Sequence, residues 1–220
     1  MEALLHNLNT AQREAVTAPP EHLLILAGAG SGKTRVLVHR MAWLVQNMGV
    51  SPHQILAVTF TNKAAREIKT RVEDLLQLPA EGLWLGTFHG IAHRLLRIHH
   101  QEANLPAHFQ ILDSDDQLRL IKRILKNHNL DDKHYAPEKI QHFINQHKDH
   151  AERPEQLSYN ERDFYKRTLV EVYREYEWLC RQNGCIDFAE LLLCSFDLLR
   201  THESIRSYNQ ERFLHILVDE

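Results

Sequence analysis

An apolar run, a glycine-rich loop and an amphipathic helix follow one another directly between residues 23 and 48. Glycines at positions 28, 30 and 32 let the backbone turn tightly and point its N–H groups at an anion, and the helix behind them directs its positive end to the same place. Lys33 and Thr34 then stand where a nucleotide site needs an ammonium group for the β and γ phosphates and a hydroxyl group for Mg²⁺. The pattern predicts a strand over Leu23–Ala27, a phosphate-binding loop and a helix.

This loop departs from the strict nucleotide-binding pattern at one position, where glycine is expected and the chain has Ala27. Because Ala27 ends the predicted strand, where ordinary β angles suffice, the alanine should cost the loop little. The alternative, a plain strand-to-helix turn, leaves the Gly-Lys-Thr triplet at 32–34 unexplained. The candidate phosphate-binding residues are Ala27, Gly28, Ala29, Gly30, Ser31, Gly32, Lys33 and Thr34.

The overall charge, the cysteines and the longest apolar runs limit the classes of protein to which this chain can belong. The 26 basic and 29 acidic residues give a formal net charge of −3, so any binding to nucleic acid must come from local residues. Cys180, Cys185 and Cys194 are odd in number and lack paired spacing, so neither a disulfide framework nor a zinc knuckle is indicated and we expect reduced, mostly buried thiols. The start of the chain is not signal-like, and no apolar run approaches the roughly 18 residues of a membrane span. We expect a cytoplasmic protein with no membrane partner.

Strands and helices alternate after the loop and then give way to helices alone. Apolar runs at Ile55–Phe60 and Leu83–Thr87 predict buried strands, which favour an α/β fold with a parallel sheet covered on both faces. The patterns from Phe88 to Arg212 are helical, and Phe213–Glu220 is again typical of a buried strand. Two domains in tandem are the alternative, but this returning strand favours a P-loop domain at 1–88 and 213–220, interrupted by a helical insertion at 89–212.

Two carboxylates end the last predicted strand and complement the loop. A nucleotide site with Mg²⁺ needs an acidic group at a neighbouring strand end to hold the ion through water, and a second to orient and deprotonate the attacking water. Asp219 fits the first role and Glu220 the second. Together with the loop they predict an ATP site in which Lys33, Asp219 and Glu220 are catalytic and Thr34 and Asp219 hold Mg²⁺.

Aromatic residues follow two of the predicted strands. Phe60 and Phe88 stand at carboxyl ends of parallel strands, the edge at which open α/β sheets bind ligands, and an exposed ring there can stack a nucleic-acid base of any kind. The alternative is that each ring packs beneath a helix. Neighbouring residues that can donate to or neutralise DNA phosphates are Thr61, Asn62, Lys63, Thr87 and His89.

Two further polar features leave alternatives open. Gln12 lies on a short predicted helix that begins near Asn9, where its amide can recognise the edge of adenine or face solvent. His89 and His93 are one helical turn apart, but no further metal ligand accompanies them, which favours polar surface histidines over a metal site.

In this order, the motifs resemble those of superfamily 1A DNA helicases, the family of UvrD, Rep and PcrA, from about Leu8 to Glu220. The segments similar to the family's motifs Q, I, Ia and Ib, to a motif of its helical insertion and to the start of its motif II are Leu8–Gln12, Ala27–Arg35, Thr59–Ala65, Gly86–Gly90, Ile186–Leu192 and Leu217–Glu220.

The resemblance implies a RecA-like motor domain (1A) with a helical domain (1B) inserted, in an enzyme that uses ATP and Mg²⁺ to move 3′ to 5′ on single-stranded DNA and to unwind duplex during repair. It implies that Gln12 contacts adenine, that Arg35 lies beside the base and that motifs Ia and Ib touch single-stranded DNA. The implied partners are single-stranded DNA, single-strand/duplex junctions and repair proteins.

The chain ends within motif II, without the family's second motor domain and its arginine fingers. We therefore expect these 220 residues alone to bind Mg-ATP weakly and not to unwind DNA. The alternatives are another P-loop ATPase or kinase, and a non-catalytic DNA-binding module. DNA-stimulated ATP turnover by the longer protein separates all three.

Overall fold

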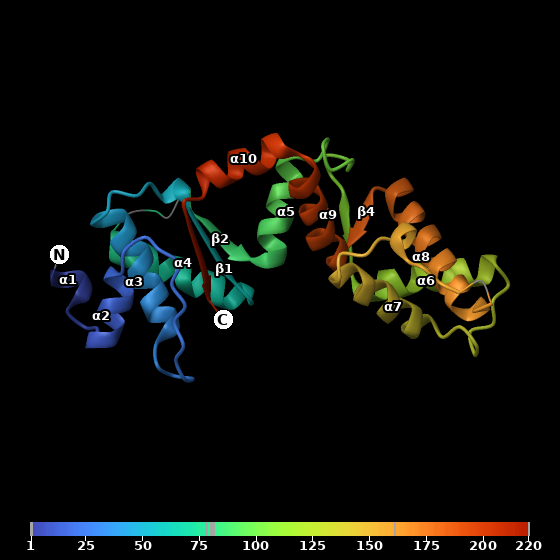
Figure 1. Ribbon diagram of the computed structural model, residues 1–220, viewed down its shortest axis with the longest axis horizontal. Coiled ribbons are helices and arrows are strands. Elements are labelled where there is room, and N and C mark those ends of the chain that lie inside the picture. The colour runs from blue at the N-terminus through green and yellow to red at the C-terminus, as the bar shows by residue number, and fades with distance from the viewer. Residues whose placement is uncertain (1, 78, 80–81, 161, 220) are drawn as a thin grey trace. The chain divides into compact units, whose positions relative to one another are not determined.

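The computed structural model describes residues 2–77, 79, 82–160 and 162–219, and packing divides the chain into two compact units (Figure 1). Unit 1 comprises Met1–Ile91 with Ser204–Glu220, and unit 2 comprises Ala92–Glu203. The boundary near the C-terminus lies before the expected residue 212 because helix α10 (Glu203–Arg212) belongs mostly to unit 1. There the guanidinium group of Arg212 lies 5.0 Å from the centre of the Trp84 ring.

A small parallel sheet organises unit 1, and its strand order among the described residues is β2-β1-β5 (Figure 1). In that order the strands span Trp84–Thr87, Ile55–Thr59 and His215–Asp219. The predictions of these three strands are confirmed. Thr87 pairs with Thr59, and Thr59 pairs with Asp219, so the three strands end in register. Their carboxyl ends therefore form one edge, where ligands of open α/β sheets bind.

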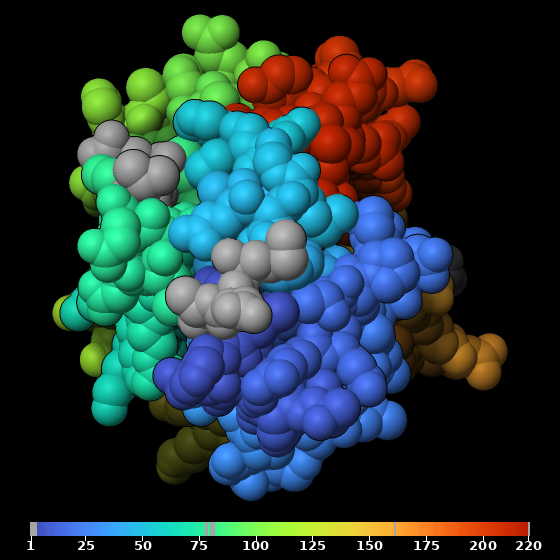
Figure 2. All heavy atoms as spheres, turned by 90° about the vertical axis from the view of Figure 1, so that its left-hand side faces the viewer, coloured from blue at the N-terminus to red at the C-terminus, as the bar shows by residue number. Residues whose placement is uncertain are grey.

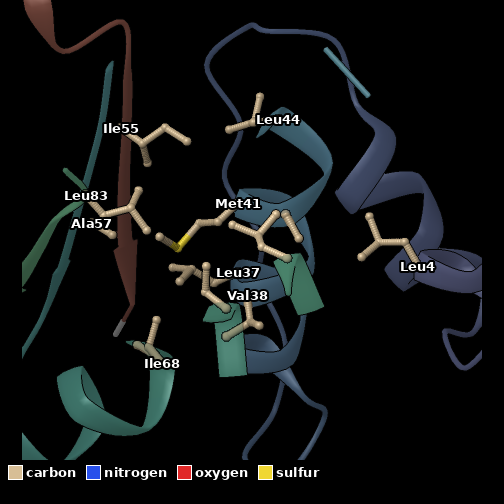
Figure 3. Packing of buried hydrophobic residues seen from close by; sticks show 12 residues of the cluster. Leu4, Leu37, Val38, Met41, Leu44, Ile55, Ala57, Ile68 and Leu83 are labelled. Carbon is tan, nitrogen blue, oxygen red and sulfur yellow. The ribbon is translucent and has the colours of Figure 1, made fainter. Parts of the chain in front are cut away.

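Two helices, α3 (Lys33–Gln46) and α4 (Asn62–Leu76), pack on one face of this sheet. Their apolar residues recur at helical spacing, so each helix turns one apolar stripe toward the strands. Met41 from α3 and Ile68 from α4 are buried in one cluster with Ile55 of β1 (Figure 3). Burying a side chain of this size contributes about 1.5–3 kcal/mol, and the cluster therefore fixes α3 against the strands.

The N-terminal helices α1 (Glu2–Leu5) and α2 (Thr10–Thr17) pack against α3 and form part of the surface of unit 1 (Figure 2, dark blue). Val16 of α2 is fully buried in a small cluster with Leu8 and with Val36 of α3. The start of the chain is thus tied to the helix that follows the glycine-rich loop.

The second face of the sheet differs from the expectation that both faces are covered. Side chains alternate along β5, and Leu217 packs against the core while Ile216 and Val218 point the other way and are 64% and 53% exposed. The prediction that both faces are covered is therefore wrong for this strand. The periodicity of an apolar strand shows that both faces suit burial, but it does not supply the element that covers them.

The apolar run Leu23–Ala27 also departs from its prediction, because it is irregular and lies outside the sheet. Leu24 and Leu26 are 81% and 85% exposed. A strand forms only where a neighbouring backbone accepts its hydrogen bonds, and none of the described strands pairs with this run. The sequence correctly placed the loop and the helix after it, whereas the strand before them is absent from the described part of the chain.

Unit 2 is mainly helical, as the sequence predicts. Its long helices α6, α7, α8 and α9 span Ser114–Asn127, Pro137–Asp149, Phe164–Gln182 and Phe188–Thr201. The prediction missed a parallel pair of short strands, β3 (Gln110–Leu112) and β4 (Cys185–Asp187). The core includes Ile121, Ile144 and Tyr173, all fully buried.

The remaining elements are α5 (Phe88–Ile98) and two single-turn 3₁₀ helices, Pro52–Gln54 and Pro154–Gln156. The three cysteines are free and buried, as expected from their spacing. In the part of the chain that the structure describes, no helix combines the length and the apolar character that a membrane crossing requires.

Candidate nucleotide site and nucleic-acid interface

The glycine-rich loop ends at Gly32, which caps the N-terminus of α3 in a left-handed conformation with a φ of 89°. A side chain at this position would be strained, and its Cβ atom would also lie 3.0 Å from the Nε2 atom of Gln12. The backbone angle thus favours glycine here, and a Cβ atom would also displace the end of the Gln12 side chain by a few tenths of an ångström. The free N–H groups of the first turn of α3 begin directly after it, as an anion site requires.

Lys33 folds back over the loop. Its Nζ atom donates hydrogen bonds to the carbonyl oxygens of Ala27 (2.8 Å) and Gly28 (3.0 Å), and the hydroxyl group of Ser31 donates to Gly28 as well (2.7 Å). The loop is exposed from Ala27 to Ser31, Ala29 and Gly30 included. The ammonium group therefore lies at the loop, where phosphate oxygens can replace the two carbonyl oxygens as its acceptors.

Thr34 and Asp219 meet although they lie 185 residues apart in the sequence. The Oγ1 atom of Thr34 lies 3.1 Å from Oδ2 and 3.3 Å from Oδ1 of Asp219, so a hydroxyl group on the first turn of α3 faces the carboxylate at the end of β5. Glu220, the expected catalytic base, lies outside the described residues.

The hydroxyl group of Thr34 and the carboxylate of Asp219 suit Mg²⁺ better than a metal ion that takes all of its ligands from the protein. Mg²⁺ prefers oxygen ligands and usually keeps several waters, with one or two carboxylates and the phosphates of a substrate completing its shell. No group of three or more histidine, cysteine or acidic side chains that could hold a metal occurs in the described part of the chain. A magnesium ion held by Thr34 and Asp219 would thus rely on water and on the nucleotide for its other ligands.

Gln12 is the N3 residue of α2 and contacts the loop. Its Oε1 atom accepts from the backbone N–H of Asn9 (3.1 Å), its own N–H donates to the side chain of Asn9 (2.9 Å), and its Nε2 atom donates to the carbonyl oxygen of Ser31 (3.0 Å). The amide therefore lies beside the phosphate-binding loop and is held there from two sides. Arg35, the other residue expected near the base, is exposed on α3.

The two strand-end phenylalanines differ in exposure. Phe60, which follows β1, is 78% exposed, and Phe88, the first residue of α5 after β2, is 40% exposed. Because β1 and β2 are adjacent and in register, both rings follow the same edge of the sheet. The alternative of packing beneath a helix does not fit Phe60, whose ring is largely free to contact a ligand.

The neighbouring DNA candidates are of two kinds. Asn62 and Lys63 are exposed, and so is Thr61, whose hydroxyl group accepts from the N–H of Ala64 and thereby caps α4. Thr87 is buried, and its hydroxyl group accepts from the N–H of Gly90. Thr87 therefore holds the turn into α5, while His89 is half-buried in the first turn of that helix.

His93 interacts with neighbouring side chains, as a structural histidine does. Its Nε2 atom accepts from Nε of Arg97 (3.0 Å), and its ring packs edge-on against Phe109. Burial and the nearby charge of Arg97 lower the pKa of His93, so the imidazole is neutral at pH 7 and able to accept this bond.

Sequence reasoning missed a second polar centre, the ionic cluster of unit 2. It lines a cavity of about 390 Å³ and comprises Lys148, Arg153, Glu177, Asp187, Glu190 and Asp197. The Nζ atom of Lys148 lies 2.8 Å from Asp187 and 2.9 Å from Glu190. The guanidinium group of Arg153 contacts Glu177 (2.7 Å), Glu190 (2.8 Å) and Asp197 (2.9 Å). Of this cluster, the sequence singled out only Asp187 and Glu190, within the motif-like segment Ile186–Leu192, because the partners are far apart in the chain.

Within the ionic cluster the pKa values of Asp187 and Glu177 are shifted in opposite directions. Burial alone would raise the pKa of Asp187, but the ammonium group of Lys148 and the hydrogen bonds that it and Tyr176 donate bring this pKa below its usual value. Burial and the neighbouring Glu190 raise the pKa of Glu177. This environment therefore favours the charged form of Asp187 and disfavours that of Glu177.

Residues 8–220 match the UvrD/REP helicase N-terminal domain. The chain is 53% identical over 218 residues to DNA helicase II of Escherichia coli (strain K12). This match covers 99% of the chain and 30% of that protein. It is 50% identical to DNA helicase II of Haemophilus influenzae over 222 residues, and 40% identical to the ATP-dependent DNA helicase PcrA of Staphylococcus aureus over 220 residues, again with 30% of each relative covered. The chain thus spans under a third of the length of these relatives.

Proposed function

The chain belongs to the UvrD/REP helicase N-terminal domain family, and on this premise we propose that it forms the ATP-binding part of a DNA helicase. Unit 1 would be part of a RecA-like motor domain, and unit 2 the helical domain inserted into it. In a protein of the length of these relatives, this motor would use ATP to move 3′ to 5′ along single-stranded DNA and to unwind duplex in repair, in the cytoplasm. The named relatives are DNA helicases.

The contact between Thr34 and Asp219 carries this proposal, because it joins the helix after the loop to the end of a parallel strand. Lys33 would neutralise charge on the β and γ phosphates, while Thr34 and Asp219 would hold Mg²⁺. The bound Mg²⁺ would supply charge stabilisation for phosphoryl transfer. Glu220 would orient the attacking water, and Gln12 and Arg35 would contact the base.

Substituting Asp219 tests the magnesium assignment. We expect Mg²⁺ to strengthen ATP binding by the wild-type protein and to have little effect on Asp219→Asn, since the amide removes the negative charge that holds the ion. Isothermal titration of ATP with and without Mg²⁺ measures the difference. Glu211→Gln, an exposed substitution on α10, is the matched control and should keep the full Mg²⁺ effect. An unchanged Mg²⁺ effect in Asp219→Asn would show that this carboxylate does not hold the ion.

The exposure of Phe60 supports the proposed interface with single-stranded DNA. Phe60→Ala should weaken binding of a labelled oligonucleotide by about 1–3 kcal/mol, equally for thymine and adenine runs, because stacking is largely indifferent to the base. Fluorescence anisotropy measures this loss. Tyr208→Ala, which removes an exposed aromatic ring from α10, should have no such effect. If both variants bind DNA as the wild type does, Phe60 is not a base-stacking residue.

A further inference from the structure

Arg40 is a buried cation of unit 1 that has no assigned role in the proposed ATP site. It lies on α3 two helical turns after Lys33 and is only 8% exposed. Its Nη1 atom donates to the carbonyl oxygens of Val16 (2.8 Å) and Ala18 (2.5 Å), and its Nη2 atom donates to that of Pro19 (3.2 Å). One guanidinium group thus binds three carbonyl oxygens, one in the last turn of α2 and two directly after it.

Two of these carbonyl oxygens, those of Val16 and Ala18, depend on a donor from outside α2, whereas that of Pro19 also accepts from the backbone N–H of Glu21 (2.8 Å). The last carbonyls of a helix have no partner within it, and Pro19 and Pro20 prevent α2 from continuing. A cation is also favourable at this negative end of the helix dipole. The planar guanidinium group can donate to several acceptors at once, which a lysine ammonium group matches less well in fixed geometry. Arg40 therefore fastens the end of α2 to α3.

The other end of α2 contacts the loop. Gln12 donates to the carbonyl oxygen of Ser31, so α2 joins the carbonyls held by Arg40 to the loop at Ser31. A helix of eight residues is too short to be stable by itself, and its placement depends on tertiary contacts. For α2 these are the packing of Val16 against Val36 and the hydrogen bonds from Arg40.

We propose that Arg40 is a positioning residue for base recognition: it fixes α2 on α3 and so keeps Gln12 beside the phosphate-binding loop. The inference rests on the proposed ATP site. The loop and Lys33 are continuous with α3, which the core holds independently of α2. Loss of Arg40 should therefore weaken the contact with the base and leave the contacts with the phosphates largely intact.

Two ligands separate these effects: Mg-ATP, and Mg-tripolyphosphate, which carries phosphates without a base. We expect Arg40→Met to lower the affinity for ATP about tenfold, as for loss of a well-placed hydrogen bond, and to change that for tripolyphosphate by less than about twofold. Arg40→Lys keeps the charge but not the planar fork, so it should lower the affinity for ATP by a smaller factor and leave that for tripolyphosphate unchanged. It replaces Arg40→Met in the test if that variant does not fold. Arg66→Met, an exposed substitution on α4, is the control and should change neither affinity.

Titrations are made below the melting temperature of each variant, so that the folded protein is measured. An equal loss for both ligands would overturn the inference, because Arg40 would then support the whole loop rather than the base contact. Unchanged ATP affinity in both Arg40 variants would overturn it too. Failure of the wild-type protein to bind either ligand would refute the proposed ATP site and the inference with it, and the wild-type titration identifies that case.

Discussion

Lys33→Ala is expected to lower the affinity of the protein for Mg-ATP about 10- to 100-fold. The ammonium group lies over the loop, held by the carbonyl oxygens of Ala27 and Gly28, and it can exchange these neutral acceptors for charged phosphate oxygens. Hydrogen bonds to charged groups contribute about 1.5–3 kcal/mol, which corresponds to this range of affinity. The fold should be little affected because the hydrogen bonds of the Lys33 ammonium group go to carbonyl oxygens of the exposed loop.

Titration with a fluorescent ATP analogue measures the effect, and melting curves check the fold. Lys63→Ala is the matched control, because it removes an exposed lysine from the proposed DNA-binding edge and should leave ATP affinity unchanged. Equal ATP affinity in Lys33→Ala and the wild type would mean that the lysine is not a phosphate ligand.

The second large effect is expected in unit 2, where Lys148→Met should lower the free energy of unfolding by about 3–5 kcal/mol. Methionine has nearly the length of lysine, so the main loss is the charge between Asp187 and Glu190. Removing one partner of a buried ion pair leaves the other charges without compensation. Lys122→Met is the control: Lys122 forms an exposed pair with Glu138 at 4.0 Å, and such pairs contribute less than about 1 kcal/mol. Urea unfolding at pH 7 compares the variants.

The effect of Lys148→Met should depend on pH with a definite sign. In the wild type the pKa of Asp187 lies below its usual value, so its contribution to stability is present above about pH 4 and is lost as the pH falls through the folded-state pKa. Without Lys148, burial raises the pKa of Asp187, so the carboxyl group takes up a proton at higher pH. The difference in unfolding free energy between the two proteins should therefore shrink from pH 7 toward pH 4. Similar instability of Lys148→Met and Lys122→Met, or a difference that grows in acid, would contradict this account of the cluster.

Local patterns predicted the parts of the fold that depend on a segment's own residues. The strands before Phe60 and Phe88, the helix after Gly32 and the helical character of unit 2 all follow from apolar spacing and turn residues. Asp219 was assigned as a magnesium ligand with Thr34 because it ends a predicted strand and a magnesium–nucleotide site needs an acidic group there, and the structure brings the two within hydrogen-bond distance. Their role in binding remains a prediction.

Features that depend on remote partners could not be predicted. The run Leu23–Ala27 has the composition of a strand, but strand formation requires a neighbouring backbone that a single segment cannot specify. Lys148 lies near the end of an amphipathic helix and has the appearance of a surface lysine, yet its carboxylate partners are tens of residues away. The carbonyl oxygens bound by Arg40 carry no side-chain signal at all.

The exposed side of β5 has a practical consequence for handling the isolated protein. Ile216 and Val218 of β5, with Leu214 directly before it, form an exposed apolar row, and among the described residues β5 pairs along one edge only. Leu24 and Leu26 add a second apolar surface. Unprotected strand edges of this kind recruit other chains and promote aggregation. Protein concentration therefore has to be treated as an experimental variable in every titration, since self-association would compete with ligands and mimic weak binding.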